Sequence, residues 1–450
     1  MTALPGGWTM STLDAVCIEM RNGISVKPTE QGGLPILRIS AVRPLKLDVD
    51  DVRFLPKEML GTANYSLIEG DLLFTRYNGN RDLVGACAKV GHIKKNLVYP
   101  DKLIRVRIDP RLALPSYVEK AASAYQAREF IDQQLKTSAG QVGISGGDLK
   151  RLPIPIAPIA EQKRIAHKLD TVLTRVDAVN TRLACVASIL KRFRQSVLAA
   201  ATAGRLTEGW RGDVQANWPT RRAEDVCAKV QSGGTPKGGF LDEGIPFLKV
   251  YNIVDQRVAF DYKPQYVSAV VHTTELRKSQ VQPGDVLMNI VGPPLGKVAI
   301  VPPEHSAWNI NQAITVFRPS WQISSQWIYF VLCEGAPIRE VLNRTKGSVG
   351  QVNISLSQCR AFELPVPPMD EQAEIVRRVA TLFAFADRLE ARLQTAQTAA
   401  DRMTPALLAK AFRGELVPQD PNDEPASELL RRLQADRPAS KSTQGRRAAA

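Results

Sequence analysis

Residues 76–81, Arg-Tyr-Asn-Gly-Asn-Arg, carry side chains that can read bases in a nucleic acid. A guanidinium group pairs with the edge of guanine, and the carboxamide of asparagine pairs with the edge of adenine. The segment follows a predicted strand, as a loop that enters a DNA groove would. We therefore predict a DNA-reading loop, although an ordinary surface loop fits these residues equally well. The candidate residues are Arg76, Tyr77, Asn78, Asn80 and Arg81.

Further candidates lie in three other places. Residues 231–239, Gln-Ser-Gly-Gly-Thr-Pro-Lys-Gly-Gly, place backbone amides and a lysine in a flexible turn that can meet phosphate, and a plain hairpin turn explains them as well. Basic and hydroxyl residues also precede two Gly-Gln-Val segments, where phosphate contact and a role in joining a domain to a helix both stay open. The candidates are Ser232, Gly233, Gly234, Thr235 and Lys237; Lys136 and Thr137; Arg344, Thr345 and Lys346; and Asn289, the counterpart of the 76–81 loop in the second half.

The sequence lacks the patterns that carry catalysis. Residues 292–297, Gly-Pro-Pro-Leu-Gly-Lys, have neither the spacing nor the hydroxyl of a phosphate loop. No Asn/Asp-Pro-Pro-aromatic segment is present to seat a flipped adenine. The four histidines lack partners at ligand or triad spacing, and the six cysteines are scattered, so we expect no catalytic residue, no metal site and buried free thiols. These residues are His92, His167, His272 and His305, and Cys17, Cys87, Cys185, Cys227, Cys333 and Cys359.

A repeat with a period of 210 residues organises the chain. Trp8 answers Trp218, Cys17 answers Cys227, and Gly140-Gln-Val answers Gly350-Gln-Val. The spacing drifts by a few residues in between and then returns, so the two copies share a scaffold and differ in their loops.

The most regular part of the repeat predicts two long helices, from Glu161 to about residue 200 and from Glu371 to about residue 410. Apolar residues alternate steps of four and three, the pattern of a helix that packs along another helix. Because both seams share one register, each helix is the natural partner of the other. Gly204 and Gly414 stand where the helices should stop. The first seam is Ile165, Leu169, Val172, Val176, Val179, Leu183, Val186, Leu190, Phe193 and Val197, and the second is the same set of positions plus 210.

Pro405 interrupts the second seam, and a proline inside a helix costs about 3 kcal/mol. We therefore expect Thr404-Pro405 to end the second long helix and start a short one. Each half outside the long helices reads as strand-rich, with a helix near 115–135 and near 325–343. A short amphipathic helix is expected over 426–433, and residues 437–450 are expected to be disordered.

These elements predict an α+β protein in which two strand-rich domains alternate with two long helices that pair as an antiparallel coiled coil. The expected boundaries are 1–157 for the first domain, 158–204 for the first helix, 205–367 for the second domain, 368–416 for the second helix and 417–450 for the tail. An antiparallel pair relates the two domains by an approximate two-fold axis, like a dimeric DNA reader fused into one chain. Half-sites of such readers lie about 34 Å apart, which implies a gap of roughly 6 bp.

Composition agrees with this interpretation. A net charge of +14 and a pI near 9.6 favour a polyanionic partner, with nucleic acid ahead of an acidic membrane. No apolar run approaches the length of a membrane span, and the N-terminus lacks the layout of a signal peptide, so we expect a cytoplasmic protein.

The motifs together closely resemble one family, the specificity subunits of type I restriction–modification systems. The resemblance rests on the order domain–helix–domain–helix, the Gly-Gln-Val-x-Ile-Ser segment, the Leu-Pro-Ile-Pro…Glu-Gln approach to each helix, and residues 414–426, Gly-Glu-Leu-Val-Pro-Gln-Asp-Pro-Asn-Asp-Glu-Pro-Ala. Two departures are Gly143 and Ala157, where the second copy has Asn353 and Pro367.

The resemblance implies a subunit without catalysis of its own. Its two target-recognition domains would each read half of a split, asymmetric site in double-stranded DNA, and its helices would set the gap. Methyltransferase subunits would dock on the helices and restriction motor-nuclease subunits would join them, bringing S-adenosylmethionine, ATP and magnesium, while this chain binds no cofactor and no membrane. Two alternatives are a self-contained restriction or modification enzyme and a coiled-coil scaffold that binds no DNA.

Overall fold

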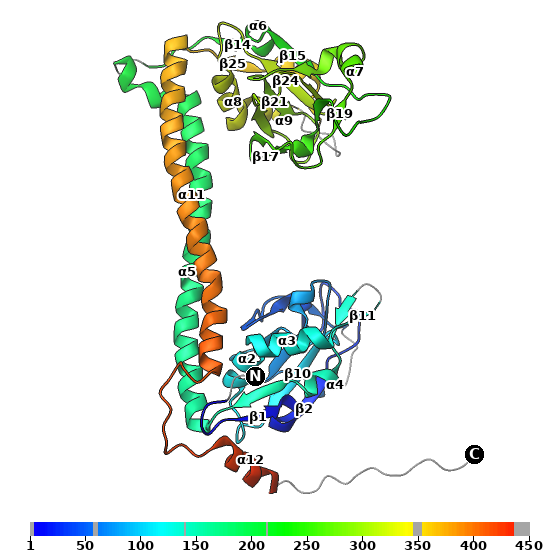
Figure 1. Cartoon of the computed structure of the whole chain (residues 1–450), viewed down its shortest axis with the longest axis vertical. Helices are drawn as coiled ribbons and strands as arrows, with labels where there is room; N and C mark the ends of the chain where they lie inside the picture. The colour runs from blue at the N-terminus through cyan, green and yellow to red at the C-terminus, as the bar shows by residue number, and fades with distance from the viewer. Residues whose placement is uncertain (1–3, 57–61, 139–140, 213–214, 345–352, 436–450) are drawn as a thin grey trace, which may run out of the picture. The chain divides into compact units, whose positions relative to one another are not determined.

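The computed structural model describes residues 4–56, 62–138, 141–212, 215–344 and 353–435. The chain forms two compact units. The first comprises residues 1–183 and 395–450, and the second comprises residues 184–394. Two long helices, α5 (Ile159–Thr202) and α11 (Met369–Phe412), each contribute one part to either unit (Figure 1).

The first unit is built around a four-stranded antiparallel sheet with the order β2-β10-β7-β9. Short pairs surround it, among them β1 with β13 and β3 with β6. The elements are β1 (Thr9–Thr12), α1 (Leu13–Val16), β2 (Cys17–Asn22), β3 (Pro35–Leu37), β4 (Val42–Arg43), β5 (Lys46–Leu47), β6 (Val52–Phe54), β7 (Leu72–Thr75), β8 (Tyr77–Asn78), β9 (Cys87–Lys89), β10 (Leu103–Ile108), α2 (Pro115–Ala122), α3 (Tyr125–Gln134), β11 (Lys136–Ser138), β12 (Gln141–Gly143), α4 (Gly146–Lys150), β13 (Pro153–Ile156) and α12 (Ala426–Ala435).

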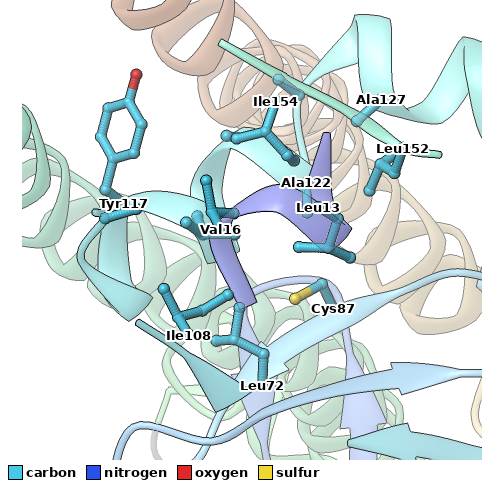
Figure 2. Close-up of a cluster of buried hydrophobic side chains, with 14 of the residues drawn as sticks. Leu13, Val16, Leu72, Cys87, Ile108, Tyr117, Ala122, Ala127, Leu152 and Ile154 are labelled. Carbon is cyan, nitrogen blue, oxygen red and sulfur yellow. The ribbon is translucent and has the colours of Figure 1, made fainter. Parts of the chain in front are cut away.

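One face of this sheet packs under α1, α2 and α3. Figure 2 shows Leu72 and Ile108 from the sheet facing Leu13 and Val16 of α1, with Tyr117 nearby. The same core takes in Ile165 and Leu169 of α5 and Leu408, Ala411 and Phe412 of α11. The domain and its helices therefore share one continuous core.

The second unit repeats this plan. Its main sheet has the order β15-β24-β21-β22, and a further sheet has the order β19-β16-β23-β20. The elements are β14 (Thr220–Arg222), α6 (Ala223–Val226), β15 (Lys229–Ser232), β16 (Ile245–Leu248), β17 (Ile253–Val254), β18 (Arg257–Val258), β19 (Tyr266–Val267), α7 (Ala269–Thr273), β20 (Gln280–Val281), β21 (Val286–Asn289), β22 (Val298–Ile300), β23 (Trp308–Ile310), β24 (Ile314–Arg318), α8 (Ser325–Glu334), α9 (Ala336–Arg344), α10 (Leu356–Arg360) and β25 (Glu363–Pro365).

The long helices pair with each other as the sequence predicts, but Val179, Val186 and Met403 of the predicted seam are exposed. In the first unit the N-terminal part of α5 packs against the C-terminal part of α11. In the second unit Val197, Leu198 and Ala201 of α5 share a core with Ile375 and Val379 of α11. The pair is therefore antiparallel, with Gly204 and Gly414 closing the helices at φ angles of 74° and 75°.

Two predictions about helix continuity were wrong. Pro405 lies inside α11 without ending it. Its ring is on an exposed face, while Ala400 and Leu408 on the buried face hold the helix in place. The single helices expected near 115–135 and 325–343 are each two helices, because the chain turns at Ser123-Ala124 and at Gly335, which adopts a φ of 89°. The short helix of the tail is confirmed as α12.

Each long helix starts from a buried Glu-Gln pair that fastens it to its domain. The carboxamide of Gln162 accepts a bond from the amide of Leu114 and donates to the carbonyl oxygens of Ala157 and Leu112. Gln372 makes the same three bonds, to Ser324, Pro367 and Gln322, each 210 residues further on. Both side chains are fully buried, so every polar atom they carry must be matched inside the protein.

The preceding glutamates differ between the copies. Glu161 accepts a hydrogen bond from the indole of Trp8 at 2.9 Å, and Glu371 accepts one from Trp218 at 2.8 Å. The second oxygen of Glu371 is bonded to Thr207 and Arg211. The second oxygen of Glu161 has no partner among the described residues, and burial raises the pKa of this carboxyl.

This difference predicts opposite effects of one substitution at the two sites. Glu371→Gln removes the carboxylate that pairs with the Arg211 guanidinium and should destabilise the second unit by about 3 kcal/mol. Glu161→Gln should instead raise the unfolding midpoint of the first unit at pH 7. The raised pKa of Glu161 means that its ionised form opposes folding above that pKa, so the gain should fade as the pH falls through it. Thermal unfolding of both variants from pH 4 to pH 8 measures this, and equal losses at both sites would contradict it.

Candidate nucleic-acid interface

Two of the predicted DNA-contacting segments meet in the first unit. A small three-stranded sheet has the order β11-β12-β8, in which Asn78 pairs with Val142 and Thr137 pairs with Val142 from the other side. The loop at 76–81 and the pair Lys136-Thr137 therefore share one sheet, although they are about 60 residues apart in the sequence. Lys136 and Thr137 are exposed there.

The start of the loop is held by Tyr77 and Gly143. The guanidinium of Arg76 lies 4.8 Å from the centre of the Tyr77 ring, a cation–π contact. A Cβ atom on Gly143 would lie only 2.2 Å from the Tyr77 ring. The ring therefore occupies the space of a side chain at position 143, which explains why the first copy has glycine where the second has Asn353.

The asparagines of the loop form its turn. The Asn78 side chain accepts from the amide of Asn80, and the Asn80 side chain accepts from the amide of Asp82. Arg81 lies 3.7 Å from Asp132 and is 62 % exposed. Each asparagine thus fixes the turn with its side-chain oxygen, as Asx turns do, and neither side-chain amide donates a bond to a described residue.

The second unit has the same junction with other residues. Val291 bridges to Asn353, and the amide of Ile354 donates to the carbonyl of Ile290, as Ile144 does to Arg76. Asn289 is fully buried, and its carboxamide bonds the backbone of Val291, Pro294 and Lys297. Its carboxamide therefore shapes the loop from inside, and a role of Asn289 in DNA contact stays a prediction.

The glycine-rich segment lies at the end of β15. Gly233 is pressed against backbone, because a Cβ there would lie 2.2 Å from the carbonyl oxygens of Ile310 and Asn311. Ser232 lies 3.3 Å from the hydroxyl of Thr315, and the side chain of Thr235 bonds Gln312. Gly234 is half-buried, and a Cβ there would lie 3.3 Å from the side chain of Leu276. The side chain of Lys237 is exposed, and among the described residues only its backbone amide is bonded, to Glu275. The first part of the segment therefore packs within the domain, while the side chain of Lys237 is exposed; contact of these residues with DNA stays a prediction.

The remaining candidates are more weakly placed. Lys136 lies 3.7 Å from Asp148 and is 78 % exposed, and Arg344 at the end of α9 pairs with Glu340. Thr345 and Lys346 lie outside the described residues, as do Gly140 and Gly350. The roles of all these residues in DNA contact stay predictions.

The described residues contain no group of three or more His, Cys, Asp or Glu side chains that could hold a metal ion. Four of the six cysteines are buried, and Cys17 and Cys227 occupy matching core positions as expected. Cys185 is exposed, which corrects the prediction for that residue. Burial raises the pKa of Cys227 and of Cys359 to about 12, so neither is a ready nucleophile.

Sequence reasoning missed two carboxylate–arginine pairs that brace the sheets. Arg107 makes a two-pronged bond to the buried Asp71, and Arg318 makes the same bond to the buried Asp285. Each aspartate follows a glycine, Gly70 or Gly284, and the two Gly-Asp pairs match between the copies of the repeat, which was the signal available in the sequence. The two copies also differ at one pair of positions. The first copy has Tyr77 against Gly143, and the second has Val291 against Asn353.

Comparison with known proteins agrees with this arrangement. The family model described as type I restriction modification DNA specificity domain matches residues 5–186 and 215–396, one match in each copy of the repeat. Together these ranges cover more than half of the chain. The chain belongs to this family.

Individual relatives point the same way. The chain is 28 % identical to the type I restriction enzyme StySPI specificity subunit of Salmonella potsdam, over 97 % of each protein. It is 40 % identical to the EcoKI specificity subunit of Escherichia coli over 202 residues, which are 44 % of this chain and 43 % of that one. It is 30 % identical to the EcoBI specificity subunit over 67 % of the latter.

Solved structures share the fold. A chain from a type I R-M system superposes with a TM-score of 0.66 at 18 % identity, covering 92 % of this chain and all of the other. The HsdS subunit from Thermoanaerobacter tengcongensis gives a TM-score of 0.52 at 20 % identity, covering 92 % and 98 %. Among the described residues, no helix is both long and apolar enough to cross a membrane.

The Tyr77–Gly143 contact predicts a double-mutant result. Gly143→Asn places a side chain in the space of the Tyr77 ring and should destabilise the first unit by about 1–3 kcal/mol. Adding Tyr77→Val recreates the pair that the second copy uses and should restore most of the loss. Chemical denaturation of the two single variants and the double variant measures the coupling, and additive losses would show that the ring does not occupy that space.

Proposed function

We propose that this chain is the DNA-recognition subunit of a type I restriction–modification system and that it reads a bipartite site. The observation that carries the proposal is the repeat itself. Two units share one scaffold, down to the bonds of Gln162 and Gln372, yet carry different residues where the loops are exposed. A chain that reads two different half-sites needs one scaffold shared by both units and different exposed residues in each.

In this proposal residues 1–157 form one target-recognition domain and residues 205–367 form the other. The β8-β11-β12 sheet presents Arg76, Asn78 and Lys136 to one half-site. Exposed residues of the second unit, Lys237 among them, meet the other. The paired helices, residues 158–204 and 368–416, set the unspecified gap between the half-sites.

The helices also offer a surface to the methyltransferase subunits. In the second unit Val186, Ile189 and Phe385 are 38 %, 53 % and 49 % exposed on α5 and α11. In the first unit Val179 and Met403 are 42 % and 47 % exposed. Val179, Val186 and Met403 were expected in the buried seam, and apolar residues left open on paired helices suit a protein partner.

The chemistry belongs to the partners. S-adenosylmethionine, ATP and magnesium would be bound by the methyltransferase and motor-nuclease subunits, in the cytoplasm, and this chain would bind no cofactor. Purified chain should therefore leave DNA unmethylated when incubated with S-adenosylmethionine. Addition of the methyltransferase subunit should produce methylation at one split sequence. Methylation by the chain alone would favour a self-contained enzyme, and no DNA binding by the complex would favour a scaffold.

Substitutions in the loop should affect one half-site only. Arg76→Ala and Asn78→Ala each remove a side chain suited to a base edge, and a good base contact contributes about 1–3 kcal/mol of discrimination. We expect discrimination to weaken roughly 10- to 100-fold at one half-site. Discrimination at the other half-site should not change. Competition binding of the complex with duplexes altered in one half-site measures this. Equal loss at both halves would indicate a folding defect instead.

A further inference from the structure

A groove of about 530 Å³ in the second unit has four cationic side chains in its lining. Lys229 comes from β15, Arg360 from α10, and Arg277 and Lys278 from the short 3-10 helix 277–279. Glu224 is the one acidic side chain among the described residues that line it. The lining includes Gln231, the first residue of the glycine-rich segment.

Several donors in the groove are open to an outside acceptor. Arg277 and Lys278 are exposed and make no side-chain bond to any described residue. Arg360 uses one nitrogen for the carbonyl of Val230 and another for the side chain of Gln231, both at 3.3 Å. Lys229 spends one of its three donors on the carbonyl of Gln280 at 2.8 Å.

The first unit has a groove in the equivalent place with a different charge. It encloses about 610 Å³ and is lined by Asp14, Cys17, Ile18, Asp109, Pro110 and Arg111. Cys17 and Cys227 fix the equivalence, because they are 210 residues apart and follow the matching helices α1 and α6. Among the described residues that line this first-unit groove, two aspartates accompany one arginine, so its charge differs from that of the groove in the second unit.

The strand register identifies one position at which the two units carry side chains of opposite charge. Glu19 lies opposite Arg107 in the β2–β10 pair, and Lys229 lies opposite Arg318 in the β15–β24 pair. Arg107 and Arg318 are themselves equivalent, since each braces the buried aspartate of its sheet. The same cross-strand position therefore holds a carboxylate beside an arginine in one unit and a lysine beside an arginine in the other.

The lysine is the less favourable choice for the fold. Like charges directly opposite each other destabilise a sheet, whereas opposite charges stabilise it. Partial burial, and then the neighbouring Arg318, lower the pKa of Lys229. In the first unit Glu19 stabilises the sheet instead, because its carboxylate lies 2.6 Å from the buried guanidinium of Arg105 and pairs with Arg107 as well. A lysine that lowers the stability of the sheet at this position is therefore a candidate for binding an anion.

We infer that this groove binds a backbone phosphate of the DNA and that the first unit has no matching contact. The inference rests on the proposed function and adds a binding site to it. Four cations at the mouth of a groove, next to a loop predicted to approach DNA, suit a phosphodiester, and phosphate contacts fix the position of a protein on the duplex. The two units would therefore hold the backbone with different strength.

Lys229→Glu separates this role from a structural one. The variant recreates the pairing of Glu19 with Arg107, so its unfolding midpoint should stay equal to or rise above that of the parent chain. Its complex with the methyltransferase subunits should nevertheless bind DNA about tenfold more weakly at 0.1 M salt, as expected for one lost phosphate contact. A lower midpoint together with unchanged DNA affinity would overturn the inference.

The double variant Arg277→Ala with Lys278→Ala provides a second test, since both side chains are exposed and neither bonds a described residue. Each phosphate contact contributes about 0.9 to the slope of log affinity against log salt. The slope should become shallower by about 1 to 2, with equal weakening on specific and unrelated duplexes. The matched control is Lys410→Ala with Arg431→Ala, which removes two exposed charges from α11 and α12. An equal change in the control would overturn the inference.

Two further measurements distinguish a contact with DNA from a site for a small anion and from a chain that binds no DNA. Titration of the parent complex with inorganic phosphate tests for a small-anion site. If phosphate raises its unfolding midpoint while the groove variants bind DNA normally, the DNA assignment fails. If the parent complex binds no DNA at any salt concentration, the proposed function fails as well. If it binds DNA and the groove variants keep its salt slope, only the groove assignment fails.

Discussion

The buried carboxamide at the start of each long helix is the constraint on which the rest of the structure depends. Gln162 and Gln372 are fully buried, and each ties the helix to backbone atoms of its own domain by three hydrogen bonds. A buried polar group left without partners costs about 1–3 kcal/mol. Each domain is therefore held to its helix in one orientation, and the orientation is the same in both copies. A reader of two half-sites requires fixed geometry at these two joints.

Around this constant frame the two copies differ in charge and in shape. The second unit supplies Arg211 to its buried glutamate, whereas Glu161 of the first unit has an oxygen without a described partner. The first unit buries Arg105 in its sheet, where the second has Val316. Position 143 is glycine because Tyr77 covers it, and its counterpart is Asn353 beside Val291. Of these differences, the exchange at position 143 lies in the small sheet that the proposal gives to DNA.

Much of the fold could be predicted from the sequence, because the repeat and the heptad seam are local and periodic signals. Helix α5 ends two residues before Gly204, and α12 begins at Ala426 as expected. The prediction at Pro405 was wrong because packing along the helix outweighs the local cost of the proline. The candidate site was harder to predict. The pairing of Asn78 with Val142 depends on long-range register, and the burial of Asn289 depends on a loop that closes over it. Neither leaves a periodic mark in the sequence.

Methylated-base sequencing of host DNA, with the chain present and with it deleted, tests the central claim most directly. The account predicts that one split motif containing a methylated adenine on each side of an unspecified gap disappears with the chain. A complex that carries the Arg76→Ala substitution should restore the motif with one half relaxed and the other half unchanged. If the methylated sites are the same with and without the chain, or if the lost motif is continuous, the account of two linked half-site readers is contradicted.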